Sequence, residues 1–247
     1  IDLDPQAHAS AHLGVMPDGR TPSVYSMLTQ GAAWATVRRR VENNLEIAPA
    51  ELNLAAAEVE LAGVVGRELI LRDLIQAEAD TCDVLIMDCG PSLGVLTLNA
   101  LAAANEVIIP LQPHFLALHG LAKLFETTGL VARRLNPGLR VSAVVLTLCD
   151  ANTRLAQEVI TDLTAFLERA RTTTTPWSQA KLMSTRIRRN IKLAECPSFG
   201  RSIFTYAATS HGAEDYARLA QEVLALAGPA TKPALEQTAP MMVPAGV

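Results

Sequence analysis

Residues 85–112 read LIMDCGPSLGVLTLNALAAANEVIIPLQ, and this stretch decides the fold class. It runs from an apolar strand through a turn at 90–92 and an apolar helix to a second apolar strand at 106–112. Strands that are apolar throughout, joined by a crossover helix, are typical of parallel sheets with helices on both faces. The pattern therefore predicts an α/β fold.

The same alternation continues on both sides of this stretch. Strands are predicted at 83–89, 106–112 and 139–148, with weaker ones at 45–48 and 181–187. Helices are predicted at 64–79, 94–104, 115–135, 153–170 and 212–227, the last with Tyr216, Leu219, Ala220, Val223 and Leu224 facing the core. These elements predict a doubly wound, mostly parallel sheet in one domain, residues 1–227, followed by a disordered Pro/Ala-rich tail at 228–247.

Composition restricts the class of protein. The chain has 247 residues, 49% of them hydrophobic, and a net charge of −4, so it can bury one substantial core. Its apolar runs are shorter than the roughly 18 residues of a membrane helix and no signal segment is visible, so we expect a cytoplasmic protein. Four separated cysteines, Cys82, Cys89, Cys149 and Cys196, favour buried free thiols over a disulfide framework or a zinc site.

Carboxylates follow two of the apolar segments. Asp2 and Asp4 stand at the start of the chain in IDLDPQ, and Asp88 ends the strand at 83–89. Ligands of parallel sheets bind beyond the carboxyl ends of the strands, where an aspartate can hold Mg²⁺ beside a phosphate. Taken alone, Asp88 fits a helix cap equally well, and Asp2 fits a solvated strand end.

Three stretches together make the sequence recognisable. IDLDPQAHASAHLG at 1–14, the stretch at 85–112, and RRNIKLAECPSFGRSIFTYAATSHGAEDYARLAQEV at 188–223 have the order and separations of ParA-family partition ATPases. These proteins are relatives of MinD in the deviant Walker A group, and the resemblance spans about residues 1–226. It implies a P-loop NTPase-like fold, ATP and Mg²⁺ as cofactors, and partition of a chromosome or plasmid. It also implies an ATP-dependent homodimer, associated with the nucleoid, that binds DNA without sequence preference and hydrolyses ATP faster with a ParB-like partner.

The resemblance also implies roles for single residues. Asp4 matches the aspartate that orients the attacking water, with Asp2 as catalytic and metal-site support, and Asp88 matches the carboxylate that holds Mg²⁺. Adenine is expected beside the loops after later strands, which contain Asp150, Arg188 and Asn190. Gly90 stands where many relatives have proline, so we expect a looser turn there.

The family's phosphate loop is not found among these residues. No G-x-x-x-x-G-K-[ST] occurs in the 247 residues, and the family places this loop upstream of the strand that ends in DxDPQ. We therefore expect the sequence to belong to a longer ATPase and the 247 residues alone to hydrolyse little ATP. The alternative is a nucleotide-independent DNA-binding or adaptor relative.

A basic segment supports the DNA prediction independently. Residues 181–201 contain one glutamate and six cations, namely Lys181, Arg186, Arg188, Arg189, Lys192 and Arg201. Such local bias favours contact with DNA phosphates, although a solvated loop or contacts to ATP phosphates would give the same pattern. A membrane-cycling ATPase fits less well, since Lys232 is the only cation in the tail.

Overall fold

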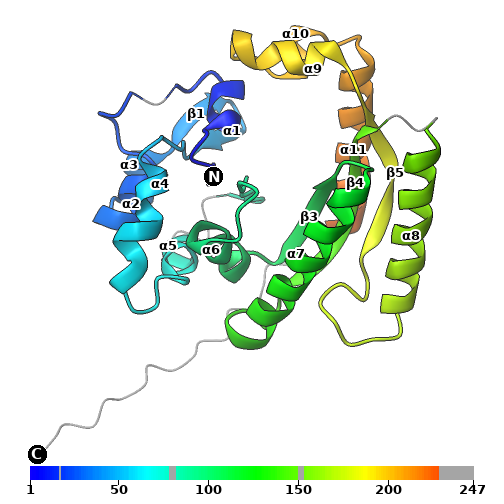
Figure 1. The fold of residues 1–247 in the computed structure, drawn as a ribbon. Coiled ribbons are helices and arrows are strands. Elements are labelled where there is room, and N and C mark those ends of the chain that lie inside the picture. The colour runs from blue at the N-terminus through cyan, green and yellow to red at the C-terminus, as the bar shows by residue number, and fades with distance from the viewer. Residues whose placement is uncertain (17, 78–81, 150–152, 228–247) are drawn as a thin grey trace, which may run out of the picture.

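A computed structural model describes residues 1–16, 18–77, 82–149 and 153–227 (Figure 1). The first part of the chain is largely helical. It contains α1 (His8–His12), α2 (Val24–Gln30), α3 (Trp34–Val37), β1 (Arg39–Glu42), β2 (Leu45–Ile47), α4 (Leu54–Glu60), η1 (Leu61–Gly63), α5 (Ile70–Ala77) and α6 (Val95–Ala103). The second part contains β3 (Glu106–Leu111), α7 (Phe115–Arg134), β4 (Arg140–Cys149), α8 (Arg154–Ala170), β5 (Lys181–Arg188), α9 (Ile191–Glu195), η2 (Cys196–Phe199), α10 (Ile203–Tyr206) and α11 (His211–Ala227).

The second part is built on a parallel sheet of order β3-β4-β5. Leu121 and Phe125 of α7 and Leu163 of α8 pack against one face of this sheet. Met183 and Ile187 of β5 point to the other face, where α11 packs. Figure 1 shows α7 and α8 on one side of the strands and α11 behind them. The predicted α/β fold, with a parallel sheet and helices on both faces, is confirmed.

The predicted strand at 83–89 is wrong as a regular strand. Only one parallel bridge forms there, between Asp2 and Asp88. Val84 is 69% and Ile86 75% exposed, although both were expected to be buried. The reason is pairing: the segment contacts residues 1–3 along one edge, and no described strand lies along its other edge. The predicted strand at 45–48 does form as β2, but it pairs antiparallel with β1.

Most of the predicted helices form at the predicted positions. Those at 94–104, 115–135 and 153–170 match α6, α7 and α8 closely. The helix predicted at 64–79 begins only at Ile70, because Gly66 takes a positive φ of 76° in the preceding turn.

The inward face predicted for α11 is only partly correct. Leu219 and Val223 pack on the sheet, whereas Tyr216 and Leu224 are 39% and 67% exposed, and Ala220 is also exposed. The face is shifted because Asp215, a charged residue, occupies a buried position beside β5.

The predictions about cysteines, membrane helices and the tail have different outcomes. The four cysteines are in the thiol form rather than in disulfides; Cys149 and Cys196 are buried as predicted, whereas Cys82 and Cys89 are exposed. Across the described ranges, none of the helices is both long and apolar enough to pass through a membrane. The predicted tail at 228–247 lies outside the described residues, so the domain boundary at 227 stays a prediction.

The two parts of the molecule meet where α6 packs on α7 and where α1 packs on η2. Gly14, with φ 71°, and Gly200, with φ 58°, approach so closely that a Cβ on Gly200 would lie 2.9 Å from the Cα of Gly14. His12 Nε2 lies 3.4 Å from the sulfur of Cys196 beside them. This contact ties the loop after Asp4 to the basic segment after β5.

Candidate functional site

Asp2, Asp4 and Asp88, which we call the aspartate site, are brought together by backbone pairing. The amide of Leu3 donates to the carbonyl of Asp88 at 2.7 Å, and the amide of Asp88 donates to the carbonyl of Ile1 at 2.9 Å. The two segments run parallel, so their carboxyl ends lie at the same edge. The structure thus places these three predicted residues in one site.

Asp2 is fully buried, and its carboxylate faces the protein. Its Oδ2 accepts hydrogen bonds from the amide and the hydroxyl of Ser10, at 2.8 and 2.7 Å. Its Oδ1 accepts from the amide of Asp4 at 3.2 Å. Asp2 therefore organises the loop, and its oxygens are already engaged within the protein.

Asp4 is only partly buried and lies against the turn after Asp88. Its Oδ1 accepts from the amide of Gln6 at 2.9 Å. A Cβ on Gly90 would sit 3.3 Å from both Cγ and Oδ1 of Asp4, a tight approach. Gly90 has no positive φ, and its missing Cβ leaves room for the Asp4 carboxylate; the looser turn expected at this glycine stays a prediction.

The electrostatics of the aspartate site suit an added cation. Desolvation raises the pKa of the Asp88 carboxyl, and the charges of Asp2 and Asp4 raise it further. Within the described ranges, neither Asp4 nor Asp88 forms an ion pair with a lysine or arginine. Cys89 is exposed as a whole residue, but desolvation at its sulfur, followed by the charge of Asp88, raises the pKa of the thiol to about 11, so this thiol stays protonated near neutrality.

The donor set fits Mg²⁺ bound together with phosphates. Mg²⁺ is commonly held by one or two carboxylates, with substrate phosphates and water completing its octahedron. Asp88 and Asp4 can supply such carboxylates. No described group of three or more His, Cys, Asp or Glu residues forms a complete metal site by itself. A magnesium ion here would therefore depend on phosphate oxygens.

A pocket of about 120 Å³ adjoins the aspartate site. It is lined by Leu3, Pro5, Ala55, Glu58, Gly90, Ser92, Leu96 and Thr97. Ligand pockets for drug-sized molecules usually measure about 300–1,000 Å³. This pocket has room for water or part of a ligand, and not for a whole nucleotide.

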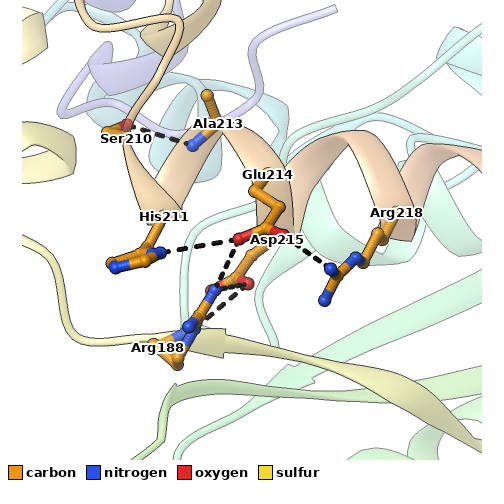
Figure 2. Close-up of polar contacts among 7 residues, drawn as sticks. All are labelled: Arg188, Ser210, His211, Ala213, Glu214, Asp215 and Arg218. Atoms are coloured by element: carbon orange, nitrogen blue, oxygen red, sulfur yellow. Dashed lines mark hydrogen bonds and ion pairs between the residues drawn. The ribbon is translucent and has the colours of Figure 1, made fainter.

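The basic segment contains a second charged constellation, the Arg188 cluster, formed by Arg188, Glu214 and Asp215. Figure 2 shows Arg188 at the end of β5 reaching the first turns of α11. Its Nη2 lies 2.6 Å from Asp215 Oδ1 and 3.2 Å from Glu214 Oε2. The backbone amide of Arg188 also donates to Asp215 Oδ2 at 3.0 Å.

Charges in the Arg188 cluster are paired within the chain, since Asp215 pairs with Arg188 and Glu214 pairs with both Arg188 and Arg218. Burial acts to raise the pKa of Asp215, but hydrogen bonds from the side chain and amide of Arg188 outweigh it and hold that pKa below its usual value. The hydrogen bond to Asp215 in turn raises the pKa of Arg188. Arg188 was predicted for both adenine and DNA; its observed contacts fasten β5 to α11.

Two further predicted residues have local structural contacts. The side chain of Asn190 accepts from the amide of Lys192 at 2.8 Å and caps α9. Lys192 Nζ lies 2.8 Å from Glu195 Oε2, which also accepts from the hydroxyl of Tyr206 at 2.9 Å. Asp150 lies outside the described residues.

The six predicted cations do not form one cluster. Lys181 begins β5 and Arg188 ends it, a separation of about 23 Å along a strand. Arg186, Arg189 and Arg201 are exposed, and in the described structure no ion pair involves them. Lys181 is likewise exposed and outside the described ion pairs, so these four cations, rather than all six, are the most available for an anionic partner.

Sequence reasoning missed several residues that shape these sites. Ser10 and Asp215 lie inside the stretches that resemble the ParA family, but nothing in their local sequence marks them as buried. Phe199 is 61% exposed and stacks on Tyr206, with ring centroids 4.9 Å apart. Phe199 lies within the basic segment and Tyr206 follows it, so both could have been read from the sequence.

Comparison with known proteins places the chain among partition proteins. A family model described as an AAA domain matches residues 1–141. A curated relative, the chromosome partitioning protein ParA of Myxococcus xanthus, is 37% identical over 91% of this chain and 76% of its own length. The chromosome-partitioning ATPase Soj of Treponema pallidum is 40% identical over 92% of this chain and 85% of its own.

A solved structure adds the ligands of a similar fold. Cobyrinic acid a,c-diamide synthase from Mycobacterium smegmatis, with bound ADP and magnesium, superposes with a TM-score of 0.72. It is 31% identical, over 90% of this chain and 79% of that one. A protein of this fold thus holds a nucleotide together with Mg²⁺.

Proposed function

Because the chain belongs to the family of ParA- and Soj-type chromosome-partitioning ATPases, we propose that it acts in ATP-dependent segregation of a chromosome or plasmid. The observation that carries this proposal is the aspartate site, where Asp4 and Asp88 meet with no described cationic partner. It lies at the carboxyl ends of parallel segments, where nucleotide phosphates bind in such folds.

Each aspartate has a separate proposed role. Asp88 holds Mg²⁺, which when bound neutralises charge on the transferred phosphoryl group. Asp4, held by the Gln6 amide and close to Gly90, accepts a hydrogen bond from the attacking water and orients it. Asp2 supports the metal site from behind, because its carboxylate holds the loop from a buried position.

The basic segment is proposed to bind DNA through phosphates. Arg186, Arg189 and Arg201 are exposed and supply positive charge without a described carboxylate partner. Arg188 and Lys192 contribute less, because Asp215 and Glu195 already neutralise them. Lys181 lies too far along β5 to share the same few phosphates. Contacts to phosphates carry no base information, so binding is independent of sequence.

The wider cycle follows from the family. We propose that the protein dimerises with ATP, associates with nucleoid DNA in the cytoplasm, and hydrolyses ATP faster when a ParB-like partner binds. Adenine would lie near the loops that contain Asp150 and Asn190. A nucleotide-independent adaptor is the competing function, and the following experiment separates the two.

The test compares Asp4→Ala with Asp83→Ala, an exposed carboxylate nearby, in the protein expressed from its complete gene. Asp4→Ala should retain ATP and DNA binding but lose about 10²–10⁴-fold in ATP turnover, the usual contribution of a positioned acid–base group. The Asp83 variant should resemble the wild type. Normal turnover in the Asp4 variant would contradict the proposed role of Asp4. A wild type that binds DNA but neither binds nor hydrolyses ATP would favour the adaptor.

A further inference from the structure

We propose that Ser10 is a positioning residue for ATP hydrolysis, acting on Asp4 through the buried carboxylate of Asp2. The inference rests on the proposed function, because Asp4 is the residue assigned to the attacking water. Ser10 lies in α1, six residues after Asp4, and is fully buried like Asp2.

The hydroxyl of Ser10 acts both as a hydrogen-bond donor and as an acceptor. It donates to Asp2 Oδ2 at 2.7 Å and accepts from the amide of Ala50 at 3.1 Å. The amide of Asp2 donates to the carbonyl of Ala48 at 3.0 Å. The segment 48–50 is therefore hydrogen-bonded both to Asp2 and to Ser10. A group that both donates and accepts is required at this position, and a serine or threonine hydroxyl provides it.

The connection then continues to Asp4. The other oxygen of Asp2 accepts from the Asp4 amide, and the Asp4 carboxylate lies against Gly90. If the Ser10 hydroxyl is removed, Asp2 loses one of its two donors on Oδ2 while remaining buried, which is costly for a carboxylate. The least costly relaxation turns Asp2 away from its present rotamer and releases the Asp4 amide.

The backbone between Asp4 and Ser10 takes a conformation that depends on the hydrogen bonds between Asp2 and Ser10. Ala7 has φ 53°, a left-handed conformation that residues other than glycine rarely adopt. This turn folds α1 back so that Ser10 reaches Asp2. Strain of this kind persists only where surrounding contacts determine the conformation. The Asp2–Ser10 hydrogen bonds are contacts of that kind.

Substitution of a purely structural serine would have different measurable effects from substitution of a positioning residue. Ser26 is a suitable control, since it is 9% exposed and its hydroxyl donates to the carbonyl of Ser23 at 2.8 Å, away from the aspartate site. Loss of general stability would affect both serine variants, whereas misplacement of Asp4 would affect only the Ser10 variant.

The experiment measures ATP turnover by Ser10→Ala, Ser10→Thr and Ser26→Ala in the protein expressed from its complete gene. We expect kcat of Ser10→Ala to fall by about ten-fold or more with KM for ATP within about two-fold, because a small misplacement of a catalytic group lowers kcat. Ser10→Thr should recover most of the activity and Ser26→Ala should match the wild type. Equal kcat for Ser10→Ala and Ser26→Ala, or a matching loss of ATP affinity, would overturn the proposal.

A second readout keeps this inference separate from the proposed function. NMR-detected hydrogen exchange of the Asp4 amide should accelerate in Ser10→Ala and not in Ser26→Ala, since that amide loses its fixed acceptor. If the wild type hydrolyses no ATP, the proposed function fails and amide exchange alone decides. Unchanged protection of the Asp4 amide would then overturn the positioning role.

Discussion

The aspartate site and the Arg188 cluster both place carboxylates beside the carboxyl end of a parallel segment, but only one of them is neutralised. Asp215 is buried and holds the Arg188 guanidinium, so its pKa is lowered despite its burial. Asp88 is exposed as a whole residue, but partial desolvation of its carboxyl and the charges of Asp2 and Asp4 raise its pKa. A carboxylate that is paired with a cation of the chain, such as Asp215, thus has a structural role. A carboxylate without such a partner, such as Asp88, marks a position for an external ion.

The largest expected effect comes from breaking the contact that joins these two regions. Gly200→Ala should lower the free energy of unfolding by about 2–4 kcal/mol, because the new Cβ needs a left-handed backbone and clashes with Gly14. Gly66→Ala is the matched control, with φ 76° and no atom within 4 Å, and should cost about 1–2 kcal/mol. Urea unfolding of both variants measures the difference. Equal losses would show that the Gly14–Gly200 contact is not tight in solution.

The same substitution should have opposite effects in the two regions. Asp215→Asn should destabilise the protein by about 1–2 kcal/mol, since it weakens charge-assisted hydrogen bonds to a half-exposed arginine. Asp88→Asn should stabilise the metal-free protein slightly, because it removes a carboxylate that its surroundings disfavour. Thermal unfolding in a chelator compares them. Destabilisation by both variants would remove the electrostatic distinction.

Acidification should sharpen this contrast. The lowered pKa of Asp215 contributes stability above its ordinary value of 3.8, and this contribution is lost as the pH falls below that value. The raised pKa of Asp88 has the opposite effect on stability. Its destabilising contribution is absent below pH 3.8 and develops as the pH rises through the raised pKa. The wild type and the Asp88 variant should therefore converge in stability below pH 3.8, whereas the wild type and the Asp215 variant should converge only below the lowered pKa of Asp215. A gap that persists in either acidic range would point to a cause other than ionisation.

The smallest expected effects concern DNA binding by neighbouring arginines. Arg189→Ala should weaken binding to every sequence and lower the slope of log K against log salt by about one, as for one lost phosphate contact. Arg188→Ala should change that slope less, because Asp215 already neutralises this arginine. Fluorescence anisotropy with two unrelated duplexes at several salt concentrations tests both. A larger slope change for Arg188 than for Arg189 would contradict the assignment.

Much of the fold and part of the candidate site could be predicted from local pattern. The helix at 153–170 was predictable because apolar residues recur along it at helical spacing, and those at 94–104 and 115–135 because they separate apolar segments typical of strands. The strand at 83–89 was not, since apolar character alone does not supply a pairing partner. The basic segment was visible as composition, but the pairing of Arg188 with Asp215 spans 27 residues and has no local signal.

The sequence by itself determined the family, the parallel α/β sheet, and the aspartates at 2, 4 and 88, because motif spacing and apolar periodicity are properties of local sequence. Only the tertiary structure decided what these side chains do. It turned the Asp2 carboxylate inward to Ser10, left Asp4 against Gly90, and divided the cations into neutralised and exposed ones. Those outcomes depend on burial and on the distances between residues remote in the chain, because burial sets the desolvation cost of a charge and distance sets its Coulomb energy.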